Sequence, residues 1–253
     1  MVQTIKNRMK VELLQPWSTF VMKTQLPVMV LEKMIKITDE IIENKESAES
    51  FGPKLASQIE DEFVIDLKIL EQEDLMMFFL DMCRTYIVQA YCQRFPFKKE
   101  EWLKEEWFIE LQSMWTIFQK DNEYNPLHFH SNCDLSAVIY LKIPEYLPSR
   151  KSHNPNDDGA IIFTSNHSAD KLWGAPYMII QPKVGDFFIF PASQGHYVNP
   201  FRTPDGKGER RSISFNATFT SKSENEAIIK KQQEEIQLQS KKNNLWSIPL
   251  TYR

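Results

Sequence analysis

Two histidines separated by one residue, His128 and His130, lie in the segment NPLHFHSN, two residues before the apolar run LSAVIYL. On an extended backbone, residues i and i+2 point to the same side, so these two imidazoles can bind one ion together. A third ligand must come from a distant strand. His196 is the best candidate, because it follows GDFFIFPASQG, which is typical of a strand and a turn that leave its imidazole at a sheet edge. Three nitrogen ligands suit Fe(II), Zn, Mn or Cu, so the spacing predicts a metal site without selecting the metal.

Any single histidine has a second interpretation, as a hydrogen-bonded residue of the core. The distant His196, in its strand-end context, favours the metal site over that interpretation for the HxH pair. The other two histidines, His153 and His167, lie in polar loop sequence, and we expect neither of them to take part in the site.

A second group of polar side chains lies in the segment ERRSISFNATF. If this segment is a strand, alternate side chains share a face. One face is then made of Arg210, Ser212, Ser214 and Asn216, and the other of Arg211, Ile213 and Phe215. A guanidinium beside two hydroxyls can bind a carboxylate through paired hydrogen bonds, which a lysine cannot do. The polar face therefore suits a dicarboxylate ligand, unless Arg210 or Arg211 is simply a charge on an exposed strand.

The elements that must position these residues differ between the two halves of the chain. In residues 26–44 and again in residues 73–93, apolar side chains recur at steps of three and four, which predicts two amphipathic helices. Gly52 is the only glycine among the first 158 residues, and this scarcity suits a helix-rich front half.

From about residue 111 the pattern changes to short apolar runs broken by Asn, Asp, Pro and Gly. The runs are LQSMWTIF, LSAVIYLKI, GAIIF, YMIIQP, GDFFIFP and RSISFNATF. Such spacing predicts an antiparallel β-sandwich or barrel. We expect three parts: a helix-rich region over residues 1–110 packed on the core, the β core over 111–220, and a polar C-terminal helix or tail over 221–253.

Charge and composition exclude several classes of protein. The net charge is −4, and the Lys and Arg residues are scattered, so we expect no nucleic-acid partner. No run approaches the roughly 20 apolar residues that cross a bilayer, so we expect no membrane partner. The cysteines, Cys83, Cys92 and Cys133, are odd in number and far apart, which indicates reduced thiols. Together these features predict a soluble cytoplasmic protein.

Over residues 111–219 the chain resembles the 2-oxoglutarate/Fe(II)-dependent oxygenase superfamily, especially a prolyl-hydroxylase-like branch common in phage and marine microbial genomes. The matching segments, in order, are YNPLHFH with LSAVIYLKIP, then GDFFIFPASQGHYVNPF, then ERRSISFN. The resemblance implies an α+β fold with a double-stranded β-helix (jelly-roll) core and N-terminal supporting helices. It also implies Fe(II), 2-oxoglutarate and O₂, with decarboxylation of 2-oxoglutarate to succinate and CO₂ while a prime substrate is oxidised, usually by hydroxylation.

The resemblance also implies roles for individual residues. His128 would be the first metal ligand and His196 the distal histidine. Arg210 and Ser214, with Ser212 between them, would hold the distal carboxylate of 2-oxoglutarate. Tyr140 matches a tyrosine that reaches the same carboxylate, although it could equally be a core residue. Asn216 would lie nearer the metal, where it could orient substrate or O₂.

One position departs from the superfamily pattern, in which the residue two after the first histidine is Asp or Glu. Here that residue is His130, and we expect it to be the ligand, with Asp134 as the alternative. A neutral imidazole in place of an anionic ligand leaves the Fe(II) site one unit more positive and alters its redox potential.

Two other functions remain open: a cupin-type three-histidine metal enzyme that does not use 2-oxoglutarate, and a binding module without activity. The prime substrate would be a small molecule or a peptide. The N-terminal helices, with Trp102 and Trp107 expected at the surface, would support the core, although they could also form a homodimer or cover the site.

Overall fold

The computed structural model describes residues 20–147, 157–165 and 176–245. Within these residues, ten strands form two antiparallel sheets, a six-stranded sheet in the order β1-β8-β5-β10-β3-β2 and a four-stranded sheet in the order β4-β9-β6-β7. The strands are β1 (Met22–Gln25), β2 (Glu62–Val64), β3 (Trp107–Gln119), β4 (Asn125–His128), β5 (Leu135–Lys142), β6 (Ile161–Thr164), β7 (Tyr177–Ile180), β8 (Asp186–Pro191), β9 (His196–Val198) and β10 (Arg210–Ser221).

The strands from β3 to β10 pair in a nested pattern. The first pairs with the last, β3 with β10, followed inward by β4 with β9, β5 with β8 and β6 with β7. This is one long antiparallel hairpin rolled into two facing sheets, which is a double-stranded β-helix. The fold class expected from the sequence is therefore confirmed, and each of the six predicted apolar runs contributes a strand.

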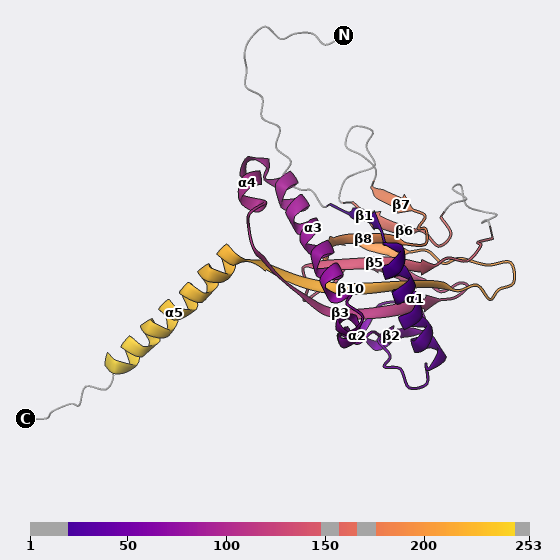
Figure 1. Cartoon of the computed structure of the whole chain (residues 1–253), viewed down its shortest axis with the longest axis horizontal. Helices are drawn as coiled ribbons and strands as arrows, with labels where there is room; N and C mark the ends of the chain where they lie inside the picture. The colour runs from indigo at the N-terminus through magenta and orange to yellow at the C-terminus, as the bar shows by residue number, and fades with distance from the viewer. Residues whose placement is uncertain (1–19, 148–156, 166–175, 246–253) are drawn as a thin grey trace, which may run out of the picture.

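The helices lie mainly on the N-terminal side of the chain. They are α1 (Val28–Glu43), α2 (Leu67–Gln72), α3 (Met76–Arg94), α4 (Lys99–Trp102) and α5 (Lys222–Leu245), with short 3₁₀ turns η1 (Gly52–Lys54) and η2 (Pro96–Lys98). The second predicted helix begins only at Met76, because Asp74 takes a left-handed conformation (φ 57°) that separates α2 from α3. Helices α1 and α3 cross the outer face of the six-stranded sheet, whereas α5 projects away from it (Figure 1).

Two apolar layers result from the alternation of side chains along β8. Phe187 and Ile189 face the helices and pack in the larger core with residues such as Met34 and Phe79. Phe188 and Phe190 face the second sheet and pack in a smaller core between the sheets. A strand buried on both faces is apolar throughout, which explains the unbroken runs in the sequence.

Two details differ from the sequence-based expectation. The N-terminal region contributes β1 and β2 to the two edges of the six-stranded sheet, next to β8 and β3. Trp102 and Trp107 are not at the surface: both are half-buried and pack with Tyr91, Phe95 and Phe219 in an aromatic cluster.

No helix among the described residues is long and apolar enough to cross a membrane. His153 and His167 lie outside the described residues.

Candidate metal centre

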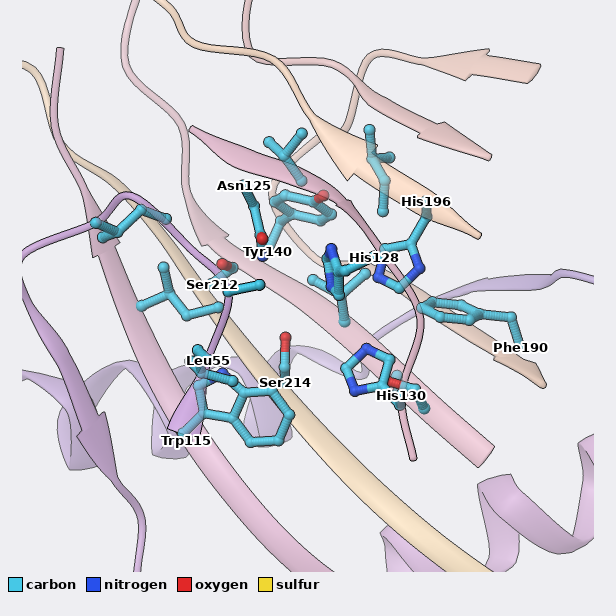
Figure 2. A pocket seen from close by; sticks show the side chains of 18 of the residues that line it. Leu55, Trp115, Asn125, His128, His130, Tyr140, Phe190, His196, Ser212 and Ser214 are labelled. Carbon is cyan, nitrogen blue, oxygen red and sulfur yellow. The ribbon is translucent and has the colours of Figure 1, made fainter. Parts of the chain in front are cut away.

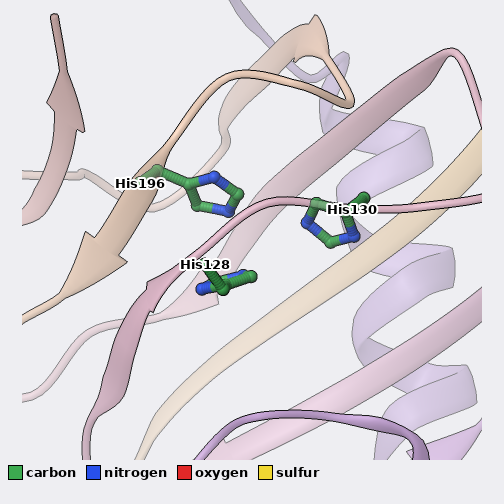
Figure 3. Close-up of side chains that lie close together, drawn as sticks. All are labelled: His128, His130 and His196. Atoms are coloured by element: carbon green, nitrogen blue, oxygen red, sulfur yellow. The ribbon is translucent and has the colours of Figure 1, made fainter.

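The three predicted metal ligands come together at one end of the four-stranded sheet (Figure 3). His128 is the last residue of β4 and His196 the first of β9, and the two are partners in the register of these strands. His130 follows two residues after β4. One nitrogen of each imidazole lies within 4.8 Å of the others, and the described residues contain no other group of this kind. His196 is not at a sheet edge as expected, because β9 lies between β4 and β6.

Backbone carbonyls orient two of these imidazoles. His128 Nδ1 lies 2.7 Å from the carbonyl oxygen of Pro126, and His196 Nδ1 lies 2.9 Å from that of Gln194. A carbonyl oxygen only accepts hydrogen bonds, so Nδ1 must carry the proton in both rings. Each Nε2 therefore keeps its lone pair for a metal ion, as in metal sites where a carbonyl fixes the ligand tautomer.

The local environment keeps the imidazoles neutral. Burial lowers the pKa of His196 to about 3 and the pKa of His130 to about 4, with repulsion from His128 adding to both shifts. Burial also lowers the pKa of His128, although its hydrogen bond to Pro126 opposes the shift. Because metals bind the neutral ring, all three side chains are in the binding form at neutral pH.

His130 and Asp134, the two candidates for the remaining metal ligand, lie in different surroundings. The backbone N–H of His130 donates to the carbonyl of Ala192 at 2.9 Å, and its ring is parallel to that of His196, with centroids 5.3 Å apart. Asp134 instead accepts a hydrogen bond from the backbone N–H of Phe219 at 3.0 Å and is absent from the imidazole group.

A cavity with about 50 Å³ of room for water-sized molecules adjoins the imidazoles. The predicted alternation of β10 is confirmed: Arg210, Ser212 and Ser214 line the cavity, while Ile213 and Phe215 pack in the core beneath the helices. Asn216 is not among the residues that line it, and its buried Oδ1 has no hydrogen-bond partner.

Arg210 is held rigidly at this cavity. Its side chain is buried, Nη1 donates to the carbonyl of Gly159 at 2.7 Å, and Nη2 donates to Oε1 of Gln119. Its Nε–H is buried without a partner. The other predicted arginine, Arg211, points to the opposite face and pairs with Asp39 and Glu209. Arg210 thus retains an unsatisfied donor beside the cavity, although burial of an unpaired polar group is costly.

Tyr140 is fully buried beneath this guanidinium, whose carbon lies 5.4 Å from the centre of the phenol ring. Tyr140 lines the cavity from β5, and its buried hydroxyl has no hydrogen-bond partner. Burial raises the pKa of Tyr140 to about 12, although Arg210 opposes the shift, so the hydroxyl is neutral and can donate a hydrogen bond. Tyr140 is thus a core residue by burial that still presents a free donor to the site.

Three polar residues of the site were not predicted from the sequence. Asn125 (Figure 2) and Ser136 line the cavity, and each has a buried oxygen without a partner. Gln119 accepts a hydrogen bond from Arg210. The sequence did hold a signal for Ser136. It precedes Tyr140 by four residues in the same apolar run, so alternation along a strand places both side chains on one face. Asn125 and Gln119 have no such signal.

Sequence comparison supports the geometry. Residues 113–216, the segment that holds all of the imidazoles and Arg210, match a family described as "Putative 2OG-Fe(II) oxygenase". This segment is thus similar to the 2-oxoglutarate/Fe(II) oxygenases. The description names the metal and the co-substrate that the resemblance implied. The sequence matches none of the curated proteins with which it was compared.

Comparison with solved structures also finds such oxygenases, at low sequence identity. A prolyl hydroxylase from Trichoplax adhaerens has a TM-score of 0.48 and 11% identity, over 79% of this chain and 83% of that one. A prolyl-4-hydroxylase from Pseudomonas putida has a TM-score of 0.42 and 15% identity, over 78% and 91%. For a 2OG-Fe(II) oxygenase family protein from Burkholderia pseudomallei the TM-score is 0.33 and the identity 15%, over 53% and 55%. This chain therefore spans only about half of that protein.

Proposed function

We propose that this protein is an Fe(II)- and 2-oxoglutarate-dependent oxygenase that hydroxylates a prime substrate. The observation that supports the proposal most is the combination in one cavity of three neutral imidazoles and a buried arginine with an unpaired donor. The imidazoles alone leave the metal and the reaction open. Arg210 adds a site for a carboxylate beside the metal, which is what a 2-oxoacid co-substrate requires.

The residues present fit a metal ion. His128 and His196 have tautomers fixed with Nε2 free, and His130 completes a set of three nitrogen donors. Three ligands on one side of an ion leave its other coordination positions open, as an iron centre that activates O₂ needs. We assign His128, His130 and His196 as the ligands.

The residues also fit 2-oxoglutarate. Its distal carboxylate would accept hydrogen bonds from Arg210 and from the Tyr140 hydroxyl, which together supply buried donors without partners. Ser212 and Ser214 line the same side of the cavity and can donate further hydrogen bonds. Asn216 does not line the cavity, so we place it at the edge of the group of side chains that would bind 2-oxoglutarate.

The protein's own contribution is to bind, orient and exclude water. When bound, Fe(II) and 2-oxoglutarate supply the oxidative chemistry, in which one atom of O₂ enters succinate as CO₂ is lost and the other enters a C–H bond of the substrate. The charge of Arg210 orients the dianion, and Gln119 and Gly159 keep the guanidinium in place. Apolar walls from Ile161, Phe190 and Val198 limit the access of water to the oxidant.

Anaerobic addition of Fe(II) and then 2-oxoglutarate to the metal-free protein tests the proposal. We expect a visible metal-to-ligand absorption band in the wild type and none in His196→Ala. In air, 2-oxoglutarate should be consumed with formation of succinate. A wild-type protein without the band, or a His196→Ala variant that retains it, would contradict the assignment.

The absence of a carboxylate from the imidazole group, among the described residues, favours a second candidate. An all-histidine centre also suits a cupin-type metal enzyme that does not use 2-oxoglutarate. Such an enzyme would bind iron equally well but would form no succinate, so the two measurements above separate the candidates.

A further inference from the structure

We propose that residues 51–61, which we call the strap, form an apolar wall of the prime-substrate subsite and select an uncharged aliphatic group. This inference rests on the proposed function, because it names the chemistry of the substrate at the same site. The strap lies outside the segment of residues 113–216 that matches the oxygenase family, so the selectivity it confers would belong to this chain in particular.

The strap is attached at both ends to elements that carry the site. Near its start, the backbone N–H of Phe51 donates to the carbonyl of Glu62 at 2.8 Å, and the Phe51 ring stacks on Trp115 of β3 with centroids 4.8 Å apart. Near its end, the backbone N–H of Gln58 donates to the carbonyl of Tyr124 at 2.9 Å. Tyr124 directly precedes β4, which ends at His128, so the strap and the metal ligands are held in one framework.

The strap presents only apolar side chains to the cavity. Leu55, Ala56 and Ile59 line it, and Trp115 and Ile117 of β3 continue the same wall. The Trp115 ring lies 6.2 Å from the ring of His130, so the wall extends to the metal ligands. In Figure 2, Leu55 and Trp115 lie across the cavity from His196 and Phe190. A substrate group between them would contact the apolar wall on one side and face the metal on the other.

The charges that line the cavity decide which group fits. Apart from the imidazoles, Arg210 is the only charged side chain among the described residues that line the cavity. These residues include no carboxylate and no lysine. A cationic substrate group would have no partner there. An anionic group would have to compete with the co-substrate for Arg210. Because a buried charge without a partner is strongly disfavoured, the wall favours an uncharged apolar group.

The test uses the N-acetyl, N-methylamide derivatives of leucine, aspartate and lysine, which differ only in side chain, and that of proline, which also lacks the backbone N–H. Each is titrated calorimetrically into the full-length protein loaded with Mn(II) and N-oxalylglycine, so that no turnover is needed. We expect the leucine and proline probes to bind at least about tenfold more tightly than the charged probes. In Leu55→Asp the preference for leucine over lysine should fall by about tenfold or more. Leu55→Ala, which is milder to the fold, should weaken leucine binding severalfold.

Leu103→Asp is the matched control, because Leu103 is an exposed leucine remote from the cavity, and it should bind all probes as the wild type does. The inference is overturned if the charged probes bind the wild type as tightly as leucine, if no probe binds, or if both Leu55 variants keep the wild-type preference with unchanged melting temperatures. The proposed function is scored separately by the Fe(II) and 2-oxoglutarate absorption band, so either can fail without the other.

Discussion

His128 and His196 are register partners on β4 and β9, and their imidazole rings lie with centroids 4.2 Å apart. Cross-strand partners on one face of an antiparallel pair are held at short distance by the backbone itself. The two proposed ligands are therefore positioned by hydrogen bonds of the sheet before any ion binds. His130, which follows β4, depends instead on its backbone bond to Ala192.

The first prediction concerns these two ligands. His128→Ala and His196→Ala should each weaken Fe(II) binding by more than about 100-fold, since changes to the partners of ligands alone cost 10- to 100-fold. Anaerobic calorimetric titration measures the affinity. Phe129→Ala is the control, because Phe129 lies between the two ligands of the HxH pair yet is 71% exposed, and it should bind iron normally.

The second prediction concerns the charge of the centre. His130→Asp would add a negative charge to the ligand set, which stabilises Fe(III) more than Fe(II). The reduction potential should fall, by about 59 mV for every tenfold difference in that stabilisation. Spectroelectrochemistry measures the potential, and the Fe(II) affinity should be kept. An unchanged potential in an iron-loaded His130→Asp variant would show that His130 is not a ligand.

The third prediction concerns the co-substrate. Arg210→Lys retains the charge but loses the paired donors, so we expect the affinity for 2-oxoglutarate to fall about 10- to 100-fold, as for a lost hydrogen bond to a charged group. The Fe(II) affinity should not change. Arg202→Lys, at an exposed arginine, is the matched control. Equal losses in the two variants would argue against a carboxylate site at Arg210.

The fourth prediction concerns Glu62, whose carboxyl group is buried beside the strap and accepts a hydrogen bond from the Ser57 hydroxyl at 2.5 Å. Burial raises the pKa of Glu62 from 4.5 to about 7, although the bond from Ser57 opposes the shift. The folded state thus binds this proton more tightly than the unfolded state. The favourable contribution is complete below pH 4.5 and is lost as the pH rises to about 7.

Replacing this carboxyl by an amide should remove the pH dependence. We expect Glu62→Gln to be more stable than the wild type at pH 8, by up to about 3 kcal/mol, and similar to it at pH 4.5. Urea denaturation at the two pH values measures the difference. Glu60→Gln, at an exposed carboxylate of the same segment, should show no such difference. A constant gap between Glu62→Gln and wild type at both pH values would contradict the predicted shift.

Much of the β core was predictable because most of its strands are buried and therefore apolar. Each apolar run from residue 111 onward forms a strand, and the alternation along β10 correctly placed Arg210 and Ser212 on the face opposite Ile213. The edge strands β1 and β2 were missed because their segments, MKTQ and EFV, are too short to stand out as apolar runs. Their strand structure comes from pairing with β8 and β3 rather than from local sequence.

The sequence-based expectations for individual side chains failed for the same reason, because contacts between residues far apart in the chain decide their burial. Trp102 and Trp107 are spaced among charged residues, which suggested exposure, but Tyr91 on α3 and Phe219 on β10 supply the partners that cover them. Similarly, Asn125 gains its importance only from burial beside the cavity. A polar side chain gives no sign in the sequence that its hydrogen bonds will be left open for a ligand.

The nested pairing of β3 to β10 also has a kinetic consequence. The pair of β6 and β7 is the innermost, and β4 with β9 is the last pair but one to close if pairing proceeds outward. Pairings between segments far apart in the chain form slowly, because loop closure must precede the contacts. A metal ion that joins His128 to His196 would therefore cross-link the rolled hairpin near its open end. Its binding would report that the chain has completed its fold, and it would slow the unravelling of the outer strands.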